Sequence, residues 1–170
     1  MERVAVIGNS GGGKSTLARR LAAELDLPCV EIDAFLWLPG WRLSPSYDSD
    51  HARHIASERW IIEGLGSRAS IPMRLKRATD IVLVDMALWA HFWLAAKRQL
   101  EWQLDQEDHP PGGFGEMPPL DRLFRTIWDV DREWMPELRR LIDAEANDGK
   151  TVYRISAIEA LDGFVDALVL

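Results

Sequence analysis

The sequence has little cysteine, no excess of positive charge and no long hydrophobic run. Its one cysteine, Cys29, excludes an intramolecular disulfide and fits a reducing compartment. The formal net charge of −7 argues against a general nucleic-acid or membrane-surface role, because those partners attract basic faces. No apolar run approaches the roughly 18 residues of a membrane-spanning helix, and residues 1–7 lack the apolar core of a signal peptide. These absences predict a cytoplasmic protein with no membrane association.

The rest of the composition is that of a globular domain. Of the 170 residues, 47% are hydrophobic and 28% are charged, and a chain of this length can bury a real core. The sequence contains no internal repeat, no low-complexity tract and no convincing boundary between domains. We therefore expect a single domain over residues 1–170.

Short apolar runs alternate with segments of helical period along the chain. The apolar runs predict strands at residues 4–7, 29–32, 60–62, 80–85 and 151–155. Helices are expected at residues 14–25, 50–59, 72–77, 86–104 and 157–168, and from residue 120 onward with a kink or break at Pro136. Strands that alternate with helices predict a parallel sheet covered on both faces.

Residues 8–15 match the phosphate-binding pattern G-x-x-x-x-G-K-[ST] in full, between a predicted strand and a predicted helix. Glycines let backbone N–H groups approach phosphate oxygens, and the start of the following helix adds its dipole. Lys14 supplies a charge to the β- and γ-phosphates, and the Ser15 hydroxyl can coordinate Mg²⁺. The predicted nucleotide-binding residues are Gly8, Asn9, Ser10, Gly11, Gly12, Gly13, Lys14, Ser15 and Thr16.

Two motifs that indicate a switch GTPase are missing from the sequence. Neither a D-x-x-G turn after the third predicted strand nor an N-K-x-D guanine-reading motif occurs. The chain is also short for a transport or AAA-type ATPase. The phosphate loop therefore belongs to another class of nucleotide-binding protein.

Several pieces of the chain together resemble a known group of proteins. They are residues 8–15 with Thr16-Leu17-Ala18, Ile32-Asp33, Trp37-Leu38-Pro39-Gly40-Trp41, Trp60-Ile61-Ile62-Glu63-Gly64, Arg74, residues 80–85 and Lys97-Arg98. On these residues the chain resembles the adenylate-kinase-related P-loop proteins often labelled topology modulation proteins, within the nucleoside-monophosphate-kinase-like group of P-loop NTPases. The resemblance implies a three-layer α/β fold, with a five-stranded parallel sheet in the order 2-3-1-4-5 and helices on both faces. It also implies phosphoryl transfer from ATP with Mg²⁺.

The resemblance assigns roles to residues outside the phosphate loop as well. Lys14, Asp33 and Arg98 would be catalytic: Asp33 would orient or deprotonate the acceptor, and Arg98 would stabilise the transferring phosphoryl group. Glu63 would hold the Ser15-bound metal ion through a water molecule. The acceptor-binding residues would be Asp33, Trp37, Trp41 and Arg74.

Each of these residues also has a structural explanation. Asp33 can cap a helix, and Glu63 can be a solvated strand end. Arg98 can be a surface arginine of a helix, as many arginines are. Trp37 and Trp41 fit the wall of a substrate pocket or the packing of a long loop equally well.

Three further expectations concern residues outside this set. Arg68 competes with Arg74 for the acceptor-side role. Asp85 suits a site role or a strand-end cap equally. The aromatic residues on helical stripes are expected to lie in the core; they are Trp89, Phe92, Trp93, Trp128 and Trp134.

Residues 105–119 differ from the rest of the chain. They contain four prolines and three glycines among acidic residues, which predicts a mobile, lid-like insertion. Residues 99–121 contain no lysine or arginine, although the resembling kinases carry arginines there; the next cations are Arg122 and Arg125.

Two functions stay open at this point. One is ATP-dependent phosphoryl transfer to a small-molecule acceptor, and the other is a nucleotide-responsive binding or regulatory protein with little or no kinase activity. The expected partners are a nucleoside triphosphate and a small molecule, and nucleic acid is disfavoured. The sequence leaves the acceptor, the preference for ATP or GTP and the oligomeric state open.

Overall fold

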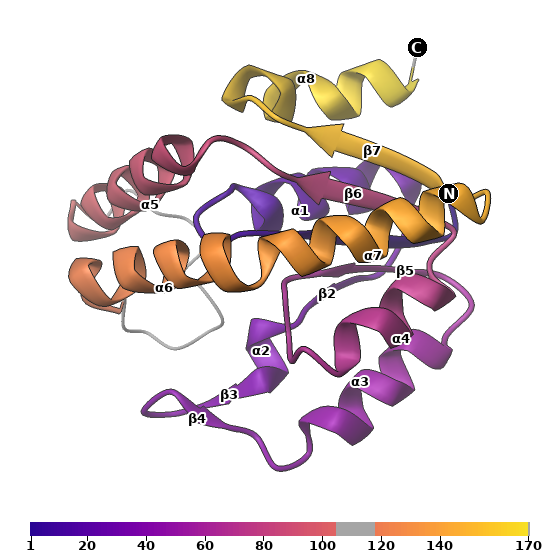
Figure 1. Cartoon of the computed structure of the whole chain (residues 1–170), viewed down its shortest axis with the longest axis horizontal. Coiled ribbons are helices and arrows are strands. Elements are labelled where there is room, and N and C mark those ends of the chain that lie inside the picture. The colour runs from indigo at the N-terminus through magenta and orange to yellow at the C-terminus, as the bar shows by residue number, and fades with distance from the viewer. Residues whose placement is uncertain (105–117, 170) are drawn as a thin grey trace.

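A parallel sheet forms the centre of the computed structural model, which describes residues 1–104 and 118–169 (Figure 1). Its five strands within this described part run in the order β2-β5-β1-β6-β7. The strands are β1 (Arg3–Gly8), β2 (Cys29–Glu31), β5 (Trp60–Glu63), β6 (Asp80–Val84) and β7 (Thr151–Ile155). Counted along the chain among themselves, these strands have the order 2-3-1-4-5, so the predicted topology is confirmed.

Helices cover both faces of this sheet. One face carries α3 (Tyr47–Ala56), α4 (Ser70–Arg77) and α7 (Met135–Asn147), and the other carries α1 (Lys14–Leu25) and α8 (Ile158–Val169). Successive side chains of a strand point to opposite faces, so Ala5 and Ile7 enter one core cluster and Val4 and Val6 enter the other. All four are 0% exposed. The predicted three-layer α/β architecture is confirmed.

Helices α5 (Leu88–Gln103) and α6 (Leu120–Glu133) pack against each other beyond the carboxyl ends of the strands (Figure 1). The predicted break near Pro136 is confirmed, since α6 ends at Glu133 and α7 begins at Met135. Pro136 lies in the first turn of α7, where its missing N–H costs no intrahelical hydrogen bond. No helix in the described part of the chain is long and apolar enough to cross a membrane.

The segment expected to be an irregular loop around residues 37–41 is instead a short hairpin. Helix α2 (Asp33–Leu36) leads into β3 (Trp37–Leu38), which pairs antiparallel with β4 (Arg42–Leu43). Gly40 and Trp41 both have positive φ, of 78° and 57°, and so form the turn. Strands of two residues are too short to leave an alternating pattern in the sequence, which explains the wrong expectation.

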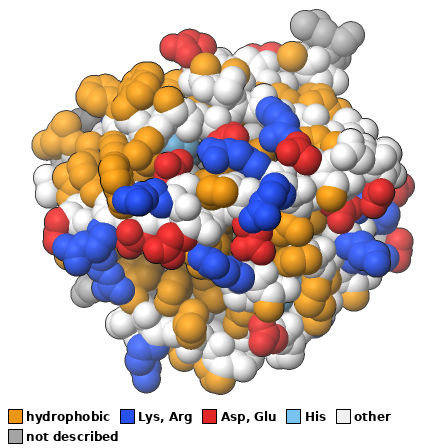
Figure 2. Space-filling view, viewed as in Figure 1, with side chains coloured by type: hydrophobic (Ala, Val, Ile, Leu, Met, Phe, Trp, Pro, Cys, Tyr) orange, Lys and Arg blue, Asp and Glu red, His pale blue; other side chains and the backbone are white. Residues whose placement is uncertain are grey.

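The prediction that the helical aromatic residues lie in the core is wrong for three of them. Trp89 is 67% exposed, Trp93 60% and Trp128 47%, and hydrophobic side chains gather on the surface over α5 (Figure 2). The buried side of α5 consists of smaller residues, Ala90, His91 and Ala95. Phe92 and Trp134 are partly buried and pack against core clusters, so for these two the expectation holds in part.

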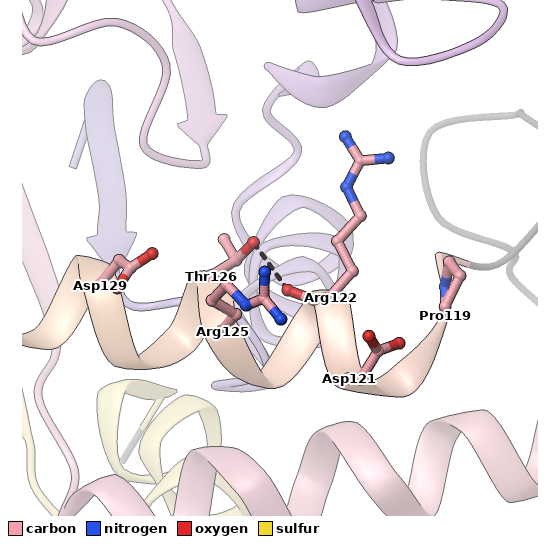
Figure 3. Close-up of a pocket in the computed structure, with 6 residues that line it drawn as sticks. All are labelled: Pro119, Asp121, Arg122, Arg125, Thr126 and Asp129. Carbon is pink, nitrogen blue, oxygen red and sulfur yellow. Dashed lines mark hydrogen bonds between the residues drawn. The ribbon is translucent and has the colours of Figure 1, made fainter.

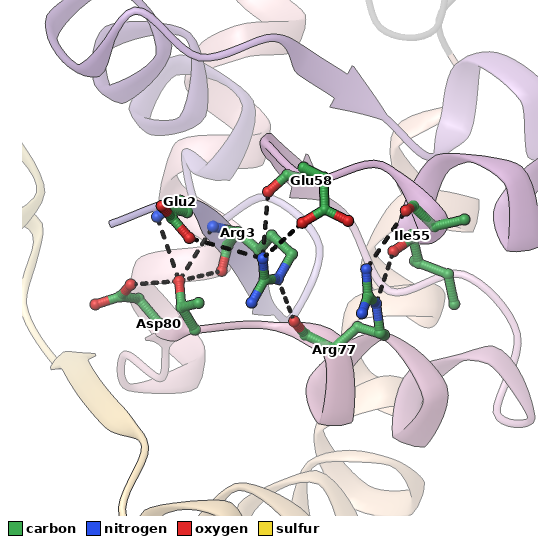
Figure 4. A network of polar contacts seen from close by, with 8 residues as sticks. Glu2, Arg3, Ile55, Glu58, Arg77 and Asp80 are labelled. Carbon is green, nitrogen blue, oxygen red and sulfur yellow. Dashed lines mark hydrogen bonds and ion pairs between the residues drawn. The ribbon is translucent and has the colours of Figure 1, made fainter.

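A polar network ties the opposite, amino end of the sheet together (Figure 4). The Arg3 guanidinium donates from Nε to the Arg77 carbonyl at 2.8 Å and from Nη1 to the Glu58 carbonyl at 3.3 Å. Thr79 donates to the Arg3 carbonyl at 3.1 Å, and Arg77 donates to the Ile55 carbonyl at 3.1 Å. These contacts join β1, α3 and α4 at the end of the strands away from the phosphate loop, so we assign them to stability.

Candidate phosphate and acceptor site

The phosphate loop leaves the carboxyl end of β1 and enters α1 at Lys14. Gly8 lies so close to the neighbouring strand that a Cβ atom there would be 2.1 Å from the Val84 carbonyl oxygen. Gly13, directly before the helix, has φ of 72°, which favours glycine. The local geometry thus explains the two glycines that the pattern G-x-x-x-x-G-K-[ST] requires. The loop lies where α/β folds bind ligands.

Lys14 turns back into this loop. Its Nζ donates to the Asn9 carbonyl oxygen at 2.7 Å, and the residue is only 9% exposed. Burial lowers the pKa of Lys14, the carboxylates of Glu63 and Asp33 raise it, and the charge of Arg98 lowers it again. The structure therefore brings all three predicted catalytic residues, Lys14, Asp33 and Arg98, within electrostatic reach of one another.

The predicted metal-binding pair also meets. The Ser15 hydroxyl donates to Oε1 of Glu63 at 3.0 Å, because β5 lies next to β1 with Glu63 opposite Val6. Burial raises the pKa of Glu63, while the charge of Lys14 and the hydrogen bond from Ser15 lower it. Within the described residues no group of three or more His, Cys, Asp or Glu side chains suits a metal ion. Two oxygen donors fit Mg²⁺, which keeps water and phosphate oxygens as its other ligands.

Asp33 is the first residue of α2 and not, as expected, the last residue of the second strand. Crowding by protein atoms raises its pKa, and the charge of Lys14 and a hydrogen bond from the Trp37 side chain lower it. The Asp33 side chain is exposed at the protein surface. The rings of Trp37 and Trp41 lie 6.1 Å apart in an edge-to-face arrangement. Asp33, Trp37 and Trp41 thus form one continuous surface beside Lys14.

Arg74 is completely buried, at 0% exposed. Its Nη2 donates to the carbonyl oxygens of Gly64 and Leu65 at 2.7 and 3.1 Å, and burial lowers its pKa to about 10. Arg74 therefore braces the turn after Glu63. Its competitor Arg68 is half exposed, where it lies 4.8 Å from the Trp134 ring. An acceptor-binding role for Arg74 stays a prediction.

Asp85 has a structural partner that the sequence did not indicate. Both of its carboxylate oxygens accept hydrogen bonds from the Arg139 guanidinium, at 2.8 and 2.9 Å. This pair holds α7 to the end of β6 and favours the structural explanation of Asp85.

Helix α6 flanks the phosphate loop on the other side. The Asn9 side chain donates to the Ile127 carbonyl at 2.9 Å, which fixes this helix against the loop. A pocket of about 520 Å³ lies along the neighbouring polar face of α6 (Figure 3); it is lined by Pro119, Asp121, Arg122, Arg125, Thr126 and Asp129. Arg122 and Arg125 thus extend from a helix in contact with the loop. The predicted lid-like insertion lies almost entirely outside the described residues.

Comparisons with known proteins identify the fold. No family model matches the chain, and no curated protein matches its sequence significantly. Solved structures do match: a shikimate kinase from Acinetobacter baumannii in complex with shikimate has a TM-score of 0.61 at 12% identity and covers 99% of this chain and 91% of its own. Shikimate kinases from Bacteroides thetaiotaomicron and Aquifex aeolicus give 0.60 at 15% and 0.51 at 16% identity, each over 98% of this chain and over 95% and 94% of their own.

The chain therefore has the α/β fold of P-loop kinases. Identities this low establish the fold and not the substrate. The narrower resemblance to topology modulation proteins stays a prediction.

Proposed function

We propose that this protein transfers a phosphoryl group from ATP to a small-molecule acceptor. One observation carries the proposal: Lys14 lies within electrostatic reach of Asp33, Glu63 and Arg98 at the carboxyl edge of the sheet, in a complete phosphate loop. Sites that move a phosphoryl group need cations at the phosphates and a carboxylate at the attacking oxygen. A site that only binds a nucleotide needs no second carboxylate, such as Asp33, in addition to Glu63.

The donor side of the proposed site consists of the phosphate loop and its neighbours. Backbone N–H groups of residues 9–15 and Lys14 bind the triphosphate. Ser15, with Glu63 behind it, holds Mg²⁺, which neutralises charge on the phosphates when it is bound. The Lys14 ammonium has three N–H donors, so it can donate to a phosphate oxygen while it still donates to the Asn9 carbonyl oxygen.

The acceptor side consists of the surface around α2 and the hairpin. Asp33 accepts the proton of an acceptor hydroxyl or orients that hydroxyl for attack. Trp37 and Trp41 offer flat apolar walls to the body of the acceptor. Arg98 stabilises the negative charge on the transferring group, since it acts on both Lys14 and Asp33.

The test is ADP release from ATP against a panel of nucleoside monophosphates, sugars, small alcohols, shikimate and gluconate. We expect at least one acceptor to stimulate ADP release, and Asp33→Asn to abolish that stimulation while leaving ATP binding intact. Asp48→Asn is a matched control, because Asp48 is an exposed acid of α3. A stimulated rate that survives Asp33→Asn refutes the proposed acceptor site.

A second function is favoured by one observation in the sequence. Residues 99–121 contain no lysine or arginine, so this stretch brings no cation to the triphosphate. In this second function the protein binds ATP and responds to it, with little or no phosphoryl transfer. ATP binding without stimulation by any acceptor is the result that favours this second function.

A further inference from the structure

His91 contacts the phosphate loop from outside it. The residue lies on α5, is 1% exposed, and places its Nδ1 3.0 Å from the carbonyl oxygen of Ser10. A carbonyl oxygen can only accept a hydrogen bond, so Nδ1 carries the hydrogen and donates it. The ring also packs directly on the loop, because a Cβ atom at Gly12 would lie 2.9 Å from Cε1 of His91.

This hydrogen bond fixes the direction of a peptide group in the loop. The C=O and the following N–H of a trans peptide point in opposite directions, and the described chain has no cis peptide. With the Ser10 carbonyl held toward α5, the N–H of Gly11 points away from α5. The N–H group of Ser10 is fixed as well, because it donates to Oδ1 of Asn9 at 2.7 Å.

We propose that His91 is a positioning residue of the phosphate loop, which holds the Ser10–Gly11 peptide so that the Gly11 N–H is directed at a bound polyphosphate. The proposal rests on the proposed function to the extent that the loop binds phosphate. It adds that the loop is shaped by α5, the same helix that carries Arg98 two turns further on.

The surroundings of His91 favour a neutral imidazole. Burial and the positive charge of Lys14 lower the pKa of His91, while its hydrogen bond to Ser10 and the acids Asp131 and Asp85 raise it. A neutral ring donates its hydrogen bond without adding a second buried cation beside Lys14. The fixed peptide in turn costs no reorganisation when the anion arrives.

Two substitutions of similar shape separate the hydrogen bond from packing. His91→Asn keeps an N–H donor at the position of Nδ1, whereas His91→Leu keeps the branch at that position and removes the donor. Calorimetric titration with inorganic tripolyphosphate is the measurement, because this probe needs only the phosphate loop. We expect His91→Leu to weaken binding about tenfold and His91→Asn to stay within about threefold of the wild-type protein.

A spectroscopic measurement accompanies the titration. The Gly11 amide resonance should shift on addition of tripolyphosphate in the wild-type protein and in His91→Asn, and should lose that shift in His91→Leu. A purely structural role of His91 predicts that the loss of tripolyphosphate binding in each variant follows the decrease of its urea midpoint, whether or not the variant keeps the donor. Should His91→Leu fail to fold, His91→Gln replaces it, since its amide reaches the Nε2 position and not Nδ1.

The results distinguish this inference from the proposed function. If the wild-type protein does not bind tripolyphosphate, the phosphate site itself is wrong. If the wild-type protein binds tripolyphosphate and His91→Leu binds it equally well, the positioning role is overturned. The role is also overturned if His91→Asn binds as weakly as His91→Leu or its replacement His91→Gln.

Discussion

The Ser15 hydroxyl donates a hydrogen bond of 3.0 Å to the carboxylate of Glu63, and this contact joins the first turn of α1 to the end of β5. The two residues are 48 positions apart in the sequence and meet because β5 pairs with the strand that leads into the phosphate loop. A hydroxyl and a carboxylate at this place would be the oxygen donors of the proposed magnesium site.

Ser15→Ala therefore removes the proposed metal ligand and leaves the loop backbone in place. We expect ATP binding to weaken about tenfold when Mg²⁺ is present and to change little when a chelator removes it. Calorimetry under the two conditions checks this. An equal loss with and without chelator would mean that the Ser15 hydroxyl contacts the nucleotide and not the metal ion.

Arg98→Ala tests the step of phosphoryl transfer. If Arg98 acts on charge that develops during transfer, kcat for the best acceptor falls about a hundredfold while the Kd of MgATP stays within about threefold. Lys97→Ala is the matched control, because Lys97 pairs with Glu101 on the exposed side of the same helix. A weaker Kd with unchanged kcat would assign Arg98 to ground-state binding.

Arg122→Ala asks whether α6 supplies the cation that residues 99–121 lack. Because α6 is fixed to Asn9 of the loop, we expect turnover to fall about tenfold. Arg132→Ala serves as control, since that side chain lies 5.8 Å from the Trp128 ring near the far end of α6. Equal steady-state rates for both variants and the wild-type protein would exclude α6 from the reaction.

We expect His51 to make the stability of the fold depend on pH. Burial and the nearby charge of Arg74 lower its pKa from 6.5 to about 4. As pH falls, the unfolded chain takes up this proton first, so the contribution of His51 is present above pH 6.5 and is lost toward pH 4. The free energy of unfolding should drop by roughly 1–3 kcal/mol from this residue alone over that interval.

Urea unfolding at pH 7, 6 and 5, for the wild-type protein and His51→Phe, measures the effect. The phenylalanine keeps a ring against Tyr47, whose ring centre is 5.8 Å away, and removes the titrating group. We expect a flatter pH dependence in the variant. Parallel curves would show that other groups cause the loss of stability in acid.

Much of the fold and part of the site could be predicted from local patterns. The phosphate loop is contiguous in the sequence, and each strand of the sheet is an apolar run long enough to recognise. The resemblance assigns Glu63 to the site, and the fold brings it to Ser15 because the carboxyl ends of parallel strands share one edge of the sheet. Lys14 and Ser15 could be predicted from the phosphate-loop pattern alone, without tertiary information.

The remaining features depend on contacts between distant residues. His91 and Ser10 are 81 positions apart, and Asn9 and Ile127 are 118 apart, so no local pattern indicates either contact. The large apolar side chains of Trp89 and Trp93 predict that their side of α5 faces the core, but both are exposed. The helix instead presents small residues, such as Ala95, to its neighbour, where close approach decides the packing.

We propose that Lys14 and its loop bind the phosphates of ATP. Calorimetric titration of MgATP into the wild-type protein and Lys14→Ala tests it most directly, with Lys76→Ala, an exposed lysine of α4, as control. We predict saturable binding to the wild-type protein and to Lys76→Ala, and a loss of at least about tenfold, or about 1.4 kcal/mol, in Lys14→Ala. Equal affinity of Lys14→Ala and the wild-type protein, or no binding to the wild-type protein, would show that this loop does not bind the phosphates through Lys14.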